Sequence, residues 1–140
     1  MLQELKATLS QLNPTPKTDE ELVEEMPLKE LKKTAAKRSS KPVEQKKVTT
    51  TQYSRDPYIS ELAKRLANGK CELCDQPAPF KDSKGKPYLE THQVVWLSKG
   101  GSDSVDNTVA LCPNCHRKMH IVNSPSDVSK LKIVAKNNAL

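Results

Sequence analysis

The sequence contains few of the residues that build a large hydrophobic core. Of its 140 residues, 35% are hydrophobic and 4% are aromatic, whereas 29% are charged. One well-packed core running through the whole chain is therefore excluded. The aromatic residues all fall between Tyr53 and Trp96, so the sequence divides into a lead without aromatic side chains and a more compact region.

Long apolar runs and a signal peptide are also absent from the sequence. No stretch approaches the roughly 20 apolar residues that a membrane-spanning helix needs. Residues 1–12 lack the basic and apolar regions of a secretory signal. We therefore expect a soluble, cytoplasmic protein that has no membrane partner.

Positive charge is present but unevenly distributed. The formal net charge is +6 at pH 7, with acidic residues in excess over 1–30 and basic residues in excess over 31–50. A basic stretch beside a weakly basic domain suits a polyanion such as nucleic acid. A solvated linker explains the same charges, so charge alone leaves both readings open.

The pattern of apolar residues and helix caps predicts three regions. Residues 1–52 form a flexible lead with short helices and a basic linker: leucines at 2, 5, 9 and 12 make one helical stripe, Thr18 begins a capping box, and Pro27 opens a further turn. The stripe docks on a partner, dimerises, or belongs to a marginal helix. Residues 53–122 form the compact domain, and residues 123–140 form a tail with a short helix over 126–136.

Within the compact domain, the sequence predicts two helices and a pair of strands. The first helix covers residues 57–68, between the cap residue Asp56 and the stop signal Asn68-Gly69. Strands at Phe80 and over residues 88–96 are expected to pair through a turn at residues 84–87. A loop follows at residues 98–103, and Pro113 opens the second helix.

All four cysteines of the chain occur in two CxxC pairs, Cys71/Cys74 and Cys112/Cys115. Two such pairs predict one structural zinc ion bound by four thiolates, which closes the coordination shell and excludes catalysis at that ion. Disulfides are the alternative, and we expect a chain without a secretory signal to lack them. A redox role for the thiols is a third reading, less well supported than one zinc site.

The three histidines of the chain, His92, His116 and His120, interleave with the cysteine pairs. His116 and His120 stand four residues apart in the second predicted helix, so their rings share one face and can bind one metal ion. A single histidine is more often a packing or surface residue than a ligand. The grouping of all three favours a second metal site.

Residues 53–121 resemble the HNH endonucleases, in the branch similar to methylcytosine-specific restriction enzymes. The matching segments are residues 65–74, 77–80, 85–92, 97–103 and 106–120, and Asn107 stands nine positions before His116, as the family pattern requires. The resemblance implies a small α+β fold of the ββα-metal (His-Me finger) type with a zinc knuckle pair. A flexible, partly helical N-terminal segment precedes it.

The same resemblance implies a metal-dependent endonuclease that hydrolyses DNA phosphodiester bonds. His116 and His120 are then ligands of a catalytic divalent ion (Mg²⁺, Mn²⁺, Ni²⁺ or Zn²⁺), and His92 lies in the hairpin beside it. Asn107 orients the loop or contacts the metal. A histidine of the hairpin acts as the general base in this family.

The sequence departs from that family pattern at Gln93. The branch has two adjacent histidines here, the first nearer the metal and the second the base, whereas this chain has His92 followed by Gln93. A neutral amide does not accept a proton usefully near pH 7. Three readings follow: His92 is itself the base, Gln93 positions a water made acidic by the metal, or the domain is a zinc-stabilised nucleic-acid-binding module with weakened or absent catalysis.

Four basic residues are candidates for contacts with DNA phosphates: Arg65, Lys99, Arg117 and Lys118. Arg117 and Lys118 belong to the helix that carries the histidines, which makes them the stronger candidates. A domain of this size leaves little surface for sequence readout. We therefore expect a targeting protein that binds the N-terminal segment as a second partner. Trp96 is expected in the core.

Overall fold

The computed structural model describes residues 15–39 and 42–140. Residue contacts divide the chain into two compact units, one ending at Thr49 and the other spanning Thr50–Leu140. The helix predicted from the leucine stripe lies outside the described residues. Among the helices in the described ranges, none is both long enough and apolar enough to cross a membrane.

The first unit contains the two short helices α2 (Asp19–Glu24) and α3 (Leu28–Arg38). The Thr18 side chain accepts a hydrogen bond from the Glu21 backbone N–H at 3.2 Å, which caps α2 as the sequence predicts. Neither helix buries a residue. Residues 42–52 form no helix or strand and are exposed.

The second unit combines three α-helices, two strands and two short 3₁₀ turns. In chain order they are α4 (Pro57–Ala67), β1 (Glu90–Gln93), η1 (Leu97–Lys99), η2 (Val105–Asn107), β2 (Thr108–Leu111), α5 (Pro113–Ile121) and α6 (Pro125–Asn138). Helix α4 begins at the predicted residue and ends one residue before the predicted end, with Asn68 as its C-cap. The Asp56 side chain accepts from the Tyr58 N–H at 2.8 Å, and Asn68 takes the left-handed conformation with φ of 53°.

The hairpin of this unit pairs different segments from those expected. β1 runs antiparallel to β2, with His92 opposite Val109 and Gln93 opposite Thr108. The predicted pairing of Phe80 with residues 88–96 is confirmed only as a short contact: the Tyr88 N–H donates to the Phe80 carbonyl at 2.9 Å, and Lys81 and Pro87 form an isolated bridge. These residues do not form a strand ladder.

Local chemistry explains why this contact does not extend into a pair of strands. The Asp82 carboxylate accepts hydrogen bonds from the Lys84 and Lys86 N–H groups at 2.9 and 3.0 Å, which closes a turn stabilised by a side chain. Pro87 has no N–H to donate to a ladder. The Phe80 and Tyr88 rings stack beside their single backbone hydrogen bond, with centroids 4.7 Å apart.

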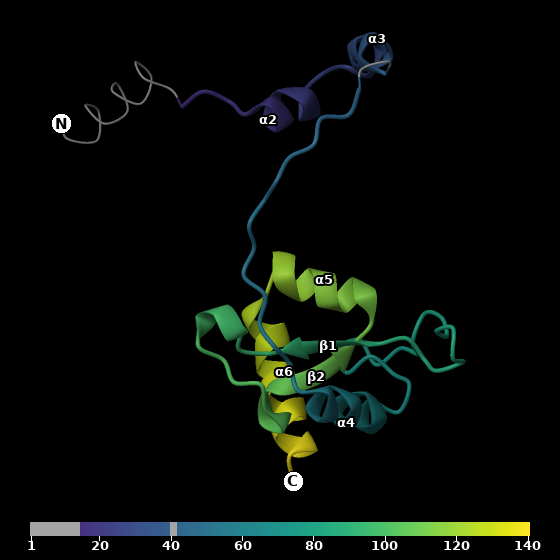
Figure 1. Ribbon diagram of the computed structural model, residues 1–140, viewed down its shortest axis with the longest axis vertical. Coiled ribbons are helices and arrows are strands. Elements are labelled where there is room, and N and C mark those ends of the chain that lie inside the picture. Colours follow the sequence, from purple (N-terminus) through teal and green to yellow (C-terminus); the bar gives the residue numbers. More distant parts are fainter. Residues whose placement is uncertain (1–14, 40–41) are drawn as a thin grey trace, which may run out of the picture. The chain divides into compact units, whose positions relative to one another are not determined.

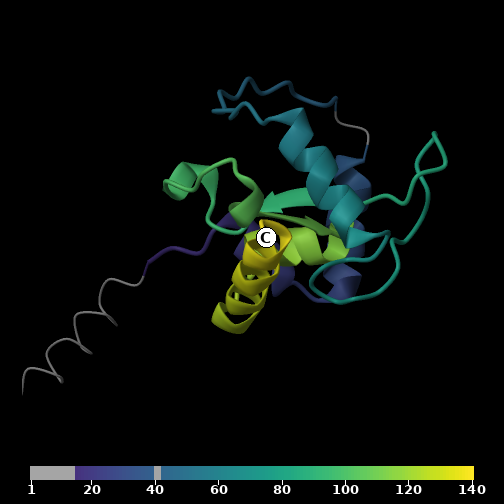
Figure 2. The same cartoon turned by 90° about the horizontal axis from the view of Figure 1, so that it is seen from below.

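Helices cover the two strands on both sides. In Figure 1 the strands run between α5 and α4, and Figures 1 and 2 show α6 lying across β2 and η2. All four residues of β2 are buried, so this strand lacks the polar alternation of a half-exposed strand. That explains why the sequence pattern does not reveal it.

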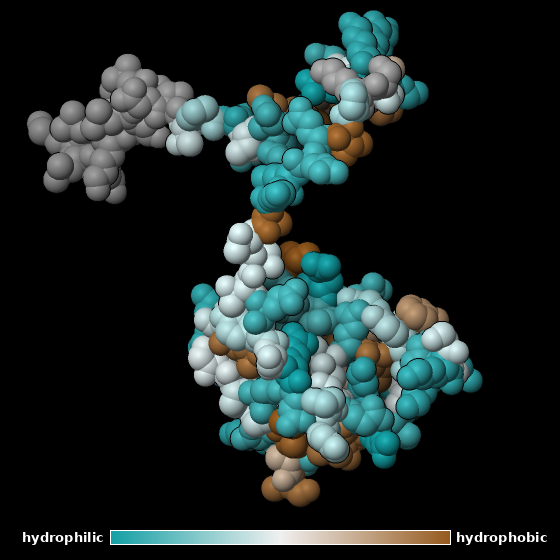
Figure 3. Space-filling view, viewed as in Figure 1, coloured by the Kyte–Doolittle hydropathy of each residue, from teal (hydrophilic) through white to brown (hydrophobic). Residues whose placement is uncertain are grey.

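The core joins the cysteine region to the C-terminal helix. One cluster of buried residues contains Cys71, Leu73, Val94, Val109, Leu111, Met119, Leu131 and Ala135. Leu131 and Ala135 come from α6 and are fully buried, so residues 123–140 contribute directly to this core. The face of the unit seen in Figure 3 is largely hydrophilic, with small separate hydrophobic areas.

Candidate metal centres

The structure brings the three histidines together from two elements. β1 supplies His92, and α5 supplies His116 and His120 from successive turns of one face. One nitrogen from each ring lies within 4.8 Å of the others. The Nε2 atoms of His116 and His120 are 3.1 Å apart, close to the separation of about 3.3 Å for two ligands of a tetrahedral zinc ion.

Glu90 fixes the orientation of His116. Its Oε1 lies 2.8 Å from His116 Nδ1, and its Oε2 accepts a hydrogen bond from the Tyr88 hydroxyl at 2.8 Å. These hydrogen bonds, that from His116 first, lower the pKa of the Glu90 carboxyl. The ionised carboxylate only accepts, so Nδ1 of His116 donates to it, which leaves Nε2 as the nitrogen that can bind a metal ion.

Sequence reasoning missed this role of Glu90. The available signal was its position two residues before His92 in a strand, because residues two apart point to the same face. Without the register of β1 and the placement of α5, nothing connects Glu90 to His116, which lies 26 residues away.

His92 is held as a neutral imidazole. It is 1% exposed, and its Nε2 has no hydrogen-bond partner among the described residues. Burial, followed by the charges of His116, His120 and Arg55, lowers the pKa of His92 to about 4. Burial also lowers the pKa of His120. Neutral imidazoles with converging nitrogens are the form that binds divalent ions, so this donor set fits such an ion.

Asn107 and Gly101 hold the chain as it leaves β1. The Asn107 amide accepts from the Val95 N–H at 2.8 Å and donates to the carbonyls of Val95 and Ser102 at 3.0 and 2.7 Å. The Gly101 N–H donates to the Trp96 carbonyl at 2.9 Å. A Cβ on Gly101 would lie 1.8 Å from the Val95 oxygen, so only glycine fits there. These contacts engage the Asn107 side chain with the backbone of the loop.

Gln93 and Trp96 lie beside the histidines with unmet hydrogen bonds. Gln93 is 4% exposed, and its Nε2 lacks a partner among the described residues. Trp96 packs its ring against His120, with centroids 5.3 Å apart, and does not belong to either buried core cluster. The expectation that Trp96 is a core residue is therefore wrong.

The four cysteines converge at one point, as their spacing predicts. Their sulfur atoms lie within 4.8 Å of one another, and all four thiols are free of disulfides. Backbone N–H groups of Leu73 and Cys74 point to the sulfur of Cys71 at 3.4 and 3.5 Å, and that of Cys115 points to Cys112 at 3.4 Å. This is a zinc knuckle arrangement, and the donor set fits a tetrahedral thiolate site.

The thiols differ in acidity because their surroundings differ. Burial raises the pKa of the Cys71 thiol, but the hydrogen bonds from backbone N–H groups outweigh it and leave that pKa lowered. Burial raises the pKa values of Cys74 and Cys115. Four thiolates this close together need a cation to balance their charge.

The predicted phosphate-binding residues occupy different surroundings. Arg117 and Lys99 are exposed at α5 and η1, with no ion pair among the described residues. Lys118 pairs with Asp127 at 3.1 Å, and Arg65 pairs with Glu61 at 3.0 Å. Arg65 also lines a separate hollow with Lys84 and Lys86, away from the histidines.

Comparison with known proteins agrees with this geometry. Residues 71–121 match the HNH endonuclease family. The Type IV methyl-directed restriction enzyme EcoKMcrA of Escherichia coli (strain K12) is 39% identical over 132 residues, which cover 93% of this chain and 47% of that enzyme. The chain therefore spans about half the length of this relative.

A solved structure is similar as well. The Type IV phosphorothioation-dependent restriction endonuclease ScoMcrA matches with a TM-score of 0.56 and 27% identity, over 91% of this chain and 24% of that chain. The hairpin, the helix with its histidines and the four-cysteine knuckle occur within or directly beside the matched residues 71–121. Residues 71–121 are therefore a segment that matches the HNH endonuclease family, within a chain similar to two restriction enzymes.

Proposed function

We propose that residues 50–140 form a metal-dependent endonuclease that hydrolyses DNA phosphodiester bonds. One observation carries the proposal: His92, His116 and His120 present ring nitrogens within 4.8 Å of one another. A divalent ion bound there would stabilise the charge that develops on the scissile phosphate and increase the acidity of a bound water.

The surrounding residues take distinct parts in this proposal. His92, His116 and His120 hold the catalytic ion, and Glu90 keeps the Nε2 lone pair of His116 directed at it through the 2.8 Å contact with Nδ1. Asn107 positions the loop after β1. The four cysteines hold a structural zinc ion, which contributes folding energy to a unit with a small core.

Gln93 limits the expected rate. It stands where the family has a general base, and its amide does not take up a proton near pH 7. Loss of a general base typically lowers the rate by roughly 10²–10⁴-fold. We propose that Gln93 orients the attacking water and that hydrolysis is slow. The same residue favours the second candidate function, a nucleic-acid-binding module without catalysis.

The two relatives suggest the substrate class. EcoKMcrA is named a methyl-directed restriction enzyme and ScoMcrA a phosphorothioation-dependent one, so both are restriction enzymes. We propose DNA as the substrate here, with Arg117 and Lys99 as the first phosphate contacts. Lys118 and Arg65 are weaker candidates because Asp127 and Glu61 already neutralise them. We further propose that a targeting protein binds the N-terminal segment.

A plasmid nicking assay tests this function. Supercoiled DNA is incubated with the zinc-loaded chain and Mg²⁺, Mn²⁺, Ni²⁺ or Zn²⁺, and we expect relaxed product that His116→Ala abolishes. The Gln93→His variant should cut faster because it restores a base. Absence of cutting by the wild type with every metal, together with cutting by Gln93→His, would favour the binding module.

A further inference from the structure

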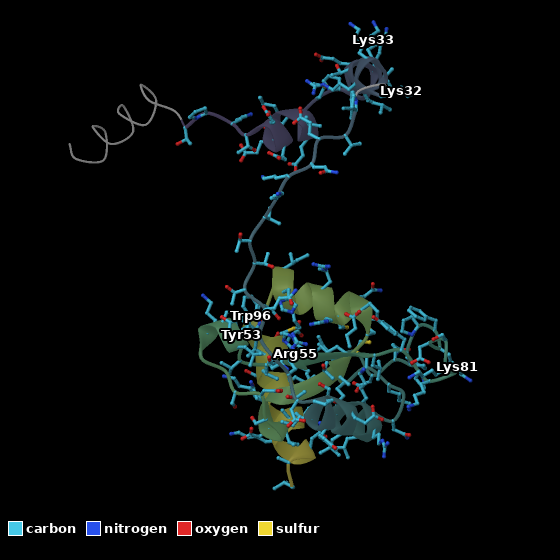
Figure 4. All side chains as sticks on the ribbon, viewed as in Figure 1. Lys32, Lys33, Tyr53, Arg55, Lys81 and Trp96 are labelled. Atoms are coloured by element: carbon cyan, nitrogen blue, oxygen red, sulfur yellow. The ribbon has the colours of Figure 1, made fainter. Side chains whose placement is uncertain are left out.

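A cavity of about 600 Å³ adjoins the histidine cluster. Its lining includes Tyr53 and Arg55 from the segment before α4, and His92, Gln93, Trp96 and His120 from the site. Figure 4 shows Tyr53, Arg55 and Trp96 on the same side of the second unit. A volume of this size falls within the range of small-molecule and cofactor pockets.

The segment that carries Tyr53 and Arg55 is tied to the site loop. The Asp56 N–H donates to Asp103 Oδ2 at 2.6 Å, and the Asp56 side chain caps α4. Residues from Thr50 onward belong to the same compact unit as the histidines. Arg55 and Tyr53 are therefore part of the wall of the site.

The cavity wall offers hydrogen-bond donors that lack acceptors. Gln93 Nε2 and Trp96 Nε1 are buried and have no partner among the described residues. Arg55 is exposed and has no carboxylate within ion-pair distance in those residues. Buried donors are costly to leave unpaired, and a guanidinium adds positive charge, so the fitting occupant carries acceptor oxygens and negative charge.

The wall also offers two aromatic rings. Trp96 is half-buried beside His120, and Tyr53 is 51% exposed. Aromatic side chains next to a cationic group form a stacking surface for nucleotide bases, because every base has a flat π face. Acceptor oxygens, negative charge and a flat ring occur together in a nucleotide.

We propose that this cavity binds a nucleotide adjacent to the scissile phosphate. Arg55 binds a phosphate of that nucleotide, Tyr53 and Trp96 contact its base, and the Gln93 amide donates to one of its acceptor oxygens. The inference rests on the proposed nuclease function, since that function places DNA at the histidines. It gives the unpartnered Nε2 of Gln93 an acceptor, beside the proposed role of this side chain in orienting the attacking water.

Trp96 provides a direct readout, because it is the only tryptophan in the chain. The full chain is titrated with a thymidine tetranucleotide without added divalent ion, and Trp96 fluorescence is followed. We expect saturable quenching, and much weaker quenching by thymidine or inorganic phosphate alone. Equal quenching by inorganic phosphate would overturn the proposal in favour of a simple anion site.

Two variants and two matched controls test the assignment. Tyr53→Ala should weaken binding by about 5- to 150-fold, the range of one base–aromatic stack. Arg55→Ala should weaken it about tenfold or more. Tyr58→Ala, which removes an exposed aromatic of α4, and Lys81→Ala, which removes an exposed positive charge, should leave it unchanged.

The outcomes separate this proposal from the nuclease function. Saturable quenching without plasmid cutting would leave the nucleotide pocket standing and refute the nuclease. Cutting of plasmid without saturable quenching, or equal losses in the controls and in the Tyr53 and Arg55 variants, would refute the pocket.

Discussion

The carboxylate of Glu90 offers the sharpest test of how the histidines are arranged. Its two oxygens lie 2.8 Å from His116 Nδ1 and from the Tyr88 hydroxyl. Replacing Glu90 by Gln removes the charge that holds the Nδ1–H form of His116, with little change in shape. Changes to such partners of metal-bound histidines typically weaken metal binding by 10–100-fold, or roughly 1.4–2.7 kcal/mol.

The assay is calorimetric titration of the zinc-loaded chain with Ni²⁺. We expect Glu90→Gln to raise the Kd for Ni²⁺ by about 10–100-fold, and Tyr88→Phe to raise it less, since Tyr88 acts only through Glu90. Glu61→Gln is the matched control, because Glu61 pairs with Arg65 on α4. An unchanged Kd in Glu90→Gln, or an equal rise in Glu61→Gln, would refute the positioning role of Glu90.

Three further perturbations probe His92, the cysteines and Gly101. The pKa of His92 is lowered from 6.5 to about 4 by burial first, so the unfolded chain binds more protons between those values. The free energy of unfolding should fall by up to about 3 kcal/mol as the pH drops through that window. Chemical denaturation at pH 7 and 4.5 measures this fall, and the His92→Gln variant should lack the contribution of His92. An identical pH dependence in the variant would contradict the prediction. Cys112→Ser should lose stoichiometric zinc and the near-UV circular dichroism of the folded unit, because binding of structural zinc contributes about 10–16 kcal/mol to the free energy of folding. Retention of both signals would count against the zinc site. Gly101→Ala should lower the free energy of unfolding by more than about 2 kcal/mol in denaturant titration. Gly85 has a φ of 80° and open space where a Cβ would lie, so Gly85→Ala should lower it by about 1–2 kcal/mol. Equal losses would show that the contact with Val95 does not matter.

Residue spacing predicts the cysteine and histidine clusters because short motifs fix local geometry. A CxxC pair brings two sulfurs together within one turn, and histidines four apart share a helix face, whatever the rest of the chain does. Capping signals likewise predict α4, where Asp56 and Asn68 act as expected. These features depend on neighbours in sequence.

Features that depend on tertiary contacts were not predictable in this way. β2 is buried on both faces, so it shows no alternation, and its pairing with β1 joins residues far apart in sequence. The same applies to the contact of Glu90 with His116 and to the packing of Leu131 from α6 against the cysteine region. Trp96 was expected in the core, yet its position beside His120 follows from the loop that Asn107 and Gly101 hold.

The most direct test of the nuclease proposal measures metal binding and DNA cutting on the same samples. Wild type and His116→Ala, each with one zinc ion at the cysteines, are titrated with Mn²⁺ and assayed for nicking of supercoiled plasmid. We predict that the wild type binds one further ion and cuts, and that His116→Ala keeps its zinc but loses both the further ion and the cutting. Equal cutting by the two proteins, or cutting by neither with any divalent metal, would contradict a catalytic metal at His92, His116 and His120.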